Sequence, residues 1–140
     1  DHILFDISPN ITFWPSVKDS LTDYIVSLDK VRSLNVATAL PGHRNCGKIT
    51  ANERIDQLFV HHEKRLAELE QMIREEPGLN GYELAGKMRW KIRSTSWADF
   101  PPAQKWFAYG EALAHLDYLV NHGRVRREVK DGLSAYYADI

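Results

Sequence analysis

The chain has 140 residues, of which 44% are hydrophobic and 11% aromatic, and this is enough to fill a core and excludes a disordered segment. Its 18 basic and 19 acidic residues balance, which argues against a protein that binds nucleic acids or membranes by net charge. Cys46 is the single cysteine, so an internal disulfide is excluded and a reducing cytoplasm is expected. No apolar run approaches the ~20 residues that span a bilayer.

The first part of the chain, residues 1–50, has the pattern of a strand, a helix and a second strand. Residues 1–5 resemble the end of a strand, and apolar side chains spaced by three and four predict a helix from about Ser16 to Leu34. Residues 36–40 form a short apolar run before Pro41-Gly42, which predicts a buried strand leading into a loop. Such a crossover unit leaves its sheet uncovered and should belong to a larger layer. Because the chain also opens without methionine inside a strand pattern, we expect it to be part of a longer protein.

From residue 51 onward the pattern becomes helical. A long helix is predicted over residues 51–76, ended by Pro77-Gly78. Asn80 should cap a second helix that runs to about Ile92, with Glu83 in the capping-box position. After a polar loop over residues 93–99, a third helix is predicted over residues 102–122. Its expected inward-facing residues are Trp106, Phe107, Leu113, Leu116, Leu119 and Val120.

The last segment, residues 124–140, contains two β-prone runs around Lys130-Asp131-Gly132, which is a strong hairpin signal. Three helices followed by a hairpin are the element order of a winged helix. We therefore expect an α+β chain in two parts: residues 1–50, the end of a β/α layer, and residues 51–140, a mostly helical winged-helix-like domain.

Two places carry candidate metal ligands, Asp1 with His2 at the end of the first strand pattern and His43 in the Pro-Gly loop. Loops at strand ends are common places for metal sites because a rigid sheet positions them. Carboxylate and imidazole together suit zinc or iron. Each residue also has an ordinary interpretation, a solvated aspartate at a chain start and a surface histidine in a loop.

The order of motifs along the chain resembles that of metallo-β-lactamase-fold hydrolases. Asp1-His2-Ile3-Leu4 resembles the segment after their fourth motif, and residues 38–43, ending in Pro-Gly-His, resemble their fifth motif. The rest is similar to the winged-helix extension of one branch, which includes the β-lactamase-like protein 2 endoribonucleases. The matching features are His62, Arg65, residues 82–85, residues 110–119 and residues 123–125.

This resemblance implies the end of an αββα sandwich and hydrolysis by a water activated between two zinc ions. It implies that Asp1 is the carboxylate that bridges the metals and that His43 is a ligand of one of them. Two departures stand out: Arg44 replaces the family's usual glycine after the histidine, and the His-x-His-x-Asp-His motif is absent. We therefore expect this chain by itself to bind no metal and to be inactive, with no certain catalytic residue. The bond that the longer enzyme cleaves, an ester, thioester, amide or phosphodiester, stays open.

Other residues are candidates for binding a partner. Arg44 could bind an anionic substrate group, and Trp97 could line a substrate cleft. Arg124, Arg126 and Arg127 could contact the backbone of RNA, which would make the second domain a nucleic-acid module. The third helix has no basic face, so we prefer a structural role in which this domain covers part of a catalytic cleft. A strand-borne basic cluster can equally be a solvated edge that discourages aggregation.

A third interpretation is a dimerisation domain, in which the chain self-associates through apolar surface on residues 17–34 and 36–40. Two histidines of the helical part, His62 and His115, are expected to be packed or hydrogen-bonded in the interior.

Overall fold

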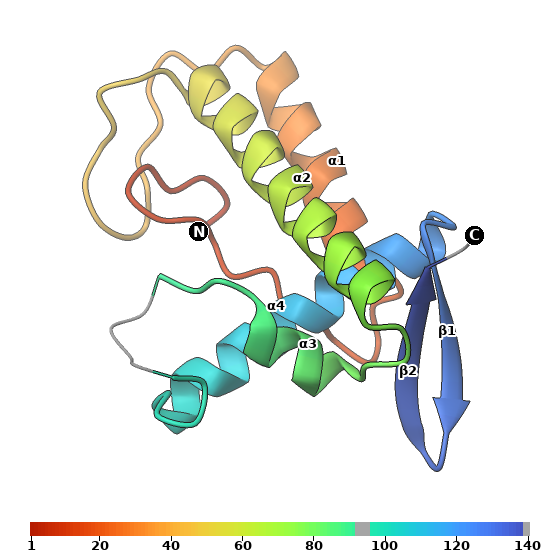
Figure 1. The fold of residues 1–140 in the computed structure, drawn as a ribbon. Helices are drawn as coiled ribbons and strands as arrows, with labels where there is room; N and C mark the ends of the chain where they lie inside the picture. Colours follow the sequence, from red (N-terminus) through yellow and green to blue (C-terminus); the bar gives the residue numbers. More distant parts are fainter. Residues whose placement is uncertain (92–95, 139–140) are drawn as a thin grey trace.

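The computed structural model describes residues 1–91 and 96–138, in which four helices precede one hairpin (Figure 1). The elements are α1 (Ser20–Ser33), α2 (Ala51–Glu75), α3 (Gly81–Lys87), α4 (Pro102–Asn121), β1 (Val125–Lys130) and β2 (Leu133–Ala138). Helices α1 and α2 lie side by side, α4 crosses their lower end, and the hairpin stands beside the end of α2. The predicted mixture of helices and a small sheet is confirmed, and the winged-helix assignment stays a prediction.

Helices α1, α2 and α3 each start at a side-chain cap, whereas α4 starts after Pro101 without one. The Thr50 hydroxyl accepts from the N–H of Glu53 at 3.1 Å, and the Glu53 carboxylate accepts from the N–H of Thr50 at 2.8 Å. Asn80 and Glu83 form the same reciprocal box at α3, which confirms the predicted cap. Asp19 accepts from the N–H of Thr22 at 2.9 Å, so α1 starts at Ser20 and not near Ser16.

One core joins all four helices to the hairpin. Helix α1 contributes Leu21, Tyr24 and Leu28, and α1 contacts both α2 and α4. The other fully buried large apolar residues come from α2, α3, α4 and β2: Ile55, Leu58, Leu66, Leu69, Ile73, Leu84, Leu116, Leu119 and Tyr136. The division of the chain near residue 50 stays a prediction.

The two strands predicted in the first part of the chain are absent from the structure. Residues 1–5 and 36–40 lie in irregular segments, and Leu40 is 81% exposed. A strand needs a neighbour for its backbone hydrogen bonds. In the described residues β1 and β2 pair with each other, and neither of these segments has a neighbouring strand.

Two helix predictions are also corrected. Helix α3 ends at Lys87, because Met88 adopts an extended backbone (ψ 152°). Ile92 and residues 93–95 of the predicted loop lie outside the described residues. Trp106 and Phe107, predicted to face inward, are 72% and 49% exposed, because the apolar face of α4 that meets α2 and α3 begins with Ala108 and Ala112.

The hairpin forms where it was predicted, with Lys130 opposite Leu133 and a two-residue turn at Asp131-Gly132. Both turn residues have positive φ, 51° and 79°, as this tight turn requires. The α2–α3 connection joins the edge of β2, since Gly78 donates to the carbonyl of Tyr136 and Tyr136 donates to that of Leu79.

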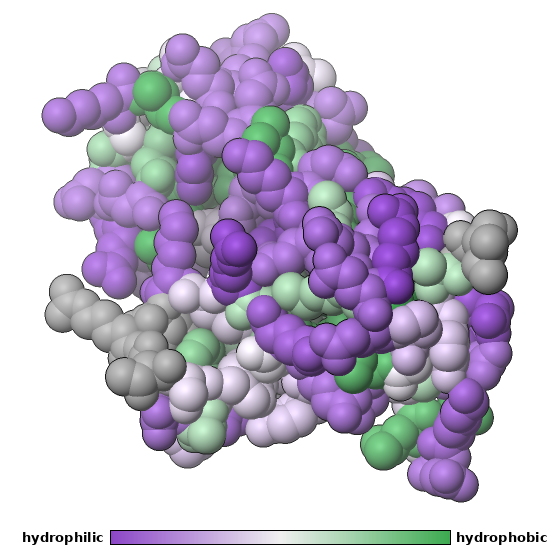
Figure 2. Space-filling model, viewed as in Figure 1, coloured by the Kyte–Doolittle hydropathy of each residue, from purple (hydrophilic) through white to green (hydrophobic). Residues whose placement is uncertain are grey.

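The molecular surface is mostly hydrophilic on the face shown in Figure 2. Hydrophobic side chains gather at the hairpin tip at lower right, where Val129 and Leu133 are 70% and 62% exposed. No helix among residues 1–91 and 96–138 combines the length and apolar character that crossing a membrane requires.

Candidate functional site

Asp1 and His43, the two predicted metal ligands, meet in the structure. The Nδ1 atom of His43 lies 2.5 Å from Oδ2 of Asp1, and both side chains are partly open to solvent. Gly42 lies next to the pair, and a Cβ at this position would be 2.8 Å from Oδ1 of Asp1, so a larger residue would require the Asp1 side chain to shift. The arrangement places one carboxylate and one imidazole at the same point on the surface.

Short polar contacts hold the two segments that carry this pair. The Asp6 carboxylate accepts from the backbone N–H of Asn45 at 3.2 Å and from its side-chain amide at 3.1 Å. Gly47 lies against Phe5 so closely that any Cβ there would overlap the ring. From α2, Arg54 donates to the carbonyl of Leu4 at 2.6 Å and to that of Ile7 at 3.1 Å. Residues 1–8 and 42–47 are therefore fastened together on the first turns of α2.

The donor set at this point is suited to zinc but incomplete. A zinc site uses four ligands, of which a catalytic site takes three from the protein. Among the described residues, no group of three or more His, Cys, Asp or Glu side chains is placed to hold a metal ion. Asp1 and His43 could therefore serve as two ligands of a larger set.

A cavity of about 440 Å³ opens along the same segment. Residues 6–8 form one wall, and α2, residues 89–91 and α4 form the others. The lining side chains that can carry charge are Asp6, Arg54, His61, Arg65, Arg89, Lys91 and Glu111.

Arg65 forms the floor of this cavity and is almost completely buried. Its guanidinium lies 4.2 Å from the centre of the Trp90 ring. One Nη atom donates to the carbonyl of Arg89 at 2.7 Å and to Glu68 at 3.0 Å. Its Nε atom lies 3.8 Å from Glu111 and makes no hydrogen bond.

Behind the cavity, His62 and His115 form a buried pair with 3.0 Å between Nδ1 of His62 and Nε2 of His115. Nδ1 of His115 lies 2.8 Å from the carbonyl of Glu111 and must donate to it. Burial lowers the pKa of His62 to about 3 and that of His115 to about 4, so both rings are neutral at pH 7. The prediction that these two histidines are packed or hydrogen-bonded in the interior is confirmed for both. In His62, Nε2 is buried without a partner.

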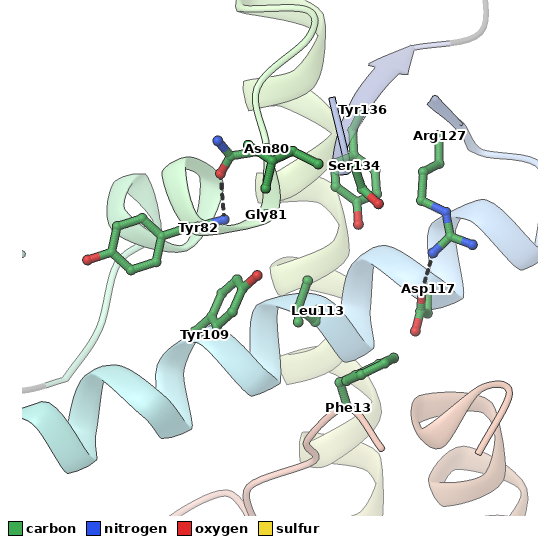
Figure 3. Close-up of a pocket in the computed structure, with 12 residues that line it drawn as sticks. Phe13, Asn80, Gly81, Tyr82, Tyr109, Leu113, Asp117, Arg127, Ser134 and Tyr136 are labelled. Atoms are coloured by element: carbon green, nitrogen blue, oxygen red, sulfur yellow. Dashed lines mark hydrogen bonds and ion pairs between the residues drawn. The ribbon is translucent and has the colours of Figure 1, made fainter. Parts of the chain in front are cut away.

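A second hollow, of about 360 Å³, lies between α3, α4 and the hairpin (Figure 3). Tyr82, Tyr109 and Tyr136 line it together with Phe13, and Arg127 pairs with Asp117 at its edge at 3.1 Å. The hollow contains no cluster of candidate metal ligands among the residues that the structure describes.

The remaining predicted site residues lie elsewhere. Arg44 is exposed with a positive φ of 66°, next to His43 in the same loop. Trp97 packs against Gly86 of α3, Tyr82 and Phe100, and it lines neither of the two cavities.

All three arginines proposed for RNA contact are paired with acidic residues. Arg124 forms ion pairs with Glu70 at 2.8 Å and with Glu63 at 3.0 Å, and these link the start of the hairpin to α2. Arg126 pairs with Glu128, and Arg127 with Asp117. These pairings reduce the positive charge that a phosphate backbone would meet.

The sequence did not single out Arg54, Arg89, Lys91 or the cavity that they line. A signal was present on α2, where positions 54, 61 and 65 fall on one helical face and carry two arginines and a histidine. Arg89 and Lys91 follow a helix end whose position depends on tertiary packing.

Residues 99–139 match the family model described as the metallo-beta-lactamase-like C-terminal domain. The fold of 99% of the chain is similar to a beta-lactamase domain protein from Burkholderia ambifaria, with a TM-score of 0.83 and 29% identity. It is also similar to the metallo-beta-lactamase family protein TTHA1429 from Thermus thermophilus, with a TM-score of 0.78 and 28% identity. The matched region covers 40% of each of those chains. No curated protein matches the sequence.

Proposed function

We propose that the chain is the C-terminal part of a metal-dependent hydrolase of the metallo-β-lactamase superfamily. The contact between Asp1 and His43 carries this proposal, because two ligand types far apart in sequence meet at 2.5 Å on neighbouring loops. The matched C-terminal family model and the two similar structures support it. Since the chain spans 40% of the length of those proteins, the remaining ligands would come from the rest of a longer chain.

In this proposal the two side chains divide the work of holding metal. The Asp1 carboxylate has two oxygens and can serve two cations, whereas His43 can bind one cation through a ring nitrogen. Zinc, when bound, would supply a water whose pKa falls to about 7. The hydrogen bonds between Asp6 and Asn45 hold the His43 loop beside the segment that carries Asp1. Residues 51–140 would form a winged-helix-like domain that covers part of the catalytic cleft of the longer enzyme. This enzyme would be cytoplasmic.

The test uses the full-length protein that contains this chain. We expect His43→Ala and Asp1→Asn each to lower the metal content and to reduce hydrolysis by at least ~100-fold, because removing even a group that orients a ligand costs 10–100-fold. His122→Ala is the matched control, because His122 is exposed at the far end of α4 and stacks on Tyr118. Normal metal content and turnover in His43→Ala would overturn the proposal.

A further inference from the structure

The cavity beside residues 6–8 has an excess of positive charge. Arg54, Arg65, Arg89 and Lys91 face two acidic residues, Asp6 and Glu111, across a hollow of about 440 Å³. Arg89 and Lys91 are exposed, and among the described residues their side chains form no ion pair. Cations without partners around a recess attract an anion.

Glu68 and Glu111 offset the charge of Arg65, from which they lie 3.0 and 3.8 Å, but they form ion pairs with neither Arg89 nor Lys91. Asp6 already accepts two hydrogen bonds from Asn45. Glu111 accepts from the Asn10 amide at 3.2 Å, and its burial raises the pKa of its carboxyl. Burial, and then the cations Arg65, Lys91, Arg54 and Lys64, lower the pKa of His61, so the wall around this histidine is electropositive.

Unused hydrogen-bonding atoms mark the same recess. Arg65 is more than nine-tenths buried, and its Nε–H has no acceptor. Nε2 of His61 is also buried without a partner. A guanidinium nitrogen can only donate, and the Glu111 carboxylate at 3.8 Å is too far away to accept a hydrogen bond from this Nε–H, so an oxygen atom of a bound anion would stabilise it.

We infer that this cavity binds the carboxylate or phosphate group of an anionic small-molecule substrate, with Arg65 as the buried donor and Arg89 and Lys91 at the rim. The inference rests on the proposed hydrolase function and names the substrate class of that site. The volume suits such a ligand, since small-molecule pockets span roughly 300–1,000 Å³. A planar guanidinium is suited to oxyanions because it presents its donors in a fixed fork.

The cavity is joined to the candidate metal pair by one short segment. Asp1 stands at one end of residues 1–8, and residues 6–8 form the cavity wall. Asp6 in turn holds Asn45, two positions after His43. Asp6 therefore links the cavity wall to the loop that carries His43, and through this link an anionic group in the cavity would anchor a substrate of the Asp1–His43 site. A polymeric substrate is less well matched, because Arg124 and Arg127 are neutralised by ion pairs and provide no track of phosphate contacts.

The first experiment titrates this chain, free of metal, with inorganic phosphate and separately with acetate at constant ionic strength. The variant Arg65→Lys lacks the Nε–H and so identifies its NMR signal. This signal should shift as the anion is added and should stop shifting once the cavity is filled. The oxyanion that binds more tightly shows whether the site takes phosphate or carboxylate.

The variants Arg89→Glu and Lys91→Glu should each weaken binding of that anion about threefold, and the two together about tenfold. Lys30→Glu makes the same charge change on the exposed side of α1 and should have no effect. Equal weakening by Lys30→Glu, or no saturable shift with either anion, would overturn the inference.

The second experiment separates this inference from the hydrolase proposal. In the full-length enzyme, the double variant Arg89→Glu/Lys91→Glu should raise KM about tenfold for an anionic substrate and leave kcat unchanged. A neutral substrate with the same scissile bond should keep its KM. Equal KM changes for both substrates would overturn the anion site while leaving the hydrolase intact. Saturable phosphate binding in a protein without hydrolase activity would keep the anion site and remove its assignment to a hydrolase substrate.

Discussion

The orientation of the His62–His115 pair follows from a single carbonyl. Because the Glu111 carbonyl can only accept, His115 must carry its proton on Nδ1 and accept on Nε2. His62 must then donate from Nδ1, which leaves its Nε2 as a bare acceptor in the interior. The two rings join α2 to α4, 53 positions apart in sequence, by a directional contact that depends on both being neutral.

This pair predicts that the protein loses stability in mild acid. The pKa values of His62 and His115 fall from 6.5 to about 3 and about 4, so between about pH 6.5 and pH 4 the unfolded chain binds more protons than the folded chain. The free energy of unfolding should therefore fall as the pH falls through this window. The limiting slope is about 1.4 kcal/mol per pH unit for each histidine. Urea unfolding across this range measures it.

The variant His62→Leu/His115→Leu should flatten that slope, because it removes both ionisable rings. His62→Leu alone should cost about 1–3 kcal/mol at neutral pH, because it leaves Nε2 of His115 without a donor. If the double variant keeps the full acid slope, other groups cause it and the pair has been assigned the wrong role.

The hairpin turn shows how local chemistry determines an element. Gly132 has φ of 79° with no atom near the position of a Cβ, so only the backbone conformation opposes a side chain there. We expect Gly132→Ala to destabilise the fold by about 1 kcal/mol. Asp131→Asn is the control, since asparagine tolerates the same positive φ and should be neutral. Thermal unfolding of the two variants measures the difference, and equal stability would contradict the turn assignment.

Elements that depend on nearby residues were predicted well. The capping box at Asn80 and the hairpin at Asp131-Gly132 formed as predicted, and α2 and α4 end within one residue of their predicted ends. The strands predicted at residues 1–5 and 36–40 did not form, because an apolar run becomes a strand only beside another strand. Trp106 and Phe107 were placed inward by periodicity alone, which cannot show where the neighbouring helices stop.

At the scale of the molecule, α1 is part of the common core, and this gives a test of the division near residue 50. Leu28 is completely buried among residues of the other elements. We expect Leu28→Ala to cost about 2–5 kcal/mol, and Val26→Ala on the exposed side of α1 to change stability by less than about 0.5 kcal/mol. Residues 51–140 alone should lose cooperative unfolding, as measured by calorimetry. A cooperative transition in that truncated chain would instead support a separate second domain.

The candidate site was predicted only in part for a related reason. Asp1 and His43 could be chosen from their residue types and the resemblance, and the structure brings them together. The cavity could not be predicted, because its walls come from four separate segments and depend on the exact end of α3. For Arg65 the sequence offers only the resemblance, because nothing in the neighbouring residues predicts that Trp90 lies across its guanidinium.

Helix α2 makes specific contacts along its whole length of 25 residues. Near its start, Arg54 donates hydrogen bonds to the carbonyls of residues 4 and 7. In its middle, His62 is hydrogen-bonded to His115 and Arg65 stacks on Trp90. Near its end, Glu70 forms an ion pair with Arg124. One residue inserted in the middle of α2 would rotate everything beyond it by about 100° and break every contact on that side together. Insertions and deletions should therefore be very rare within α2 in related sequences. They should instead fall in the exposed loop that precedes α2, and alignments of these sequences should show their gaps in that loop.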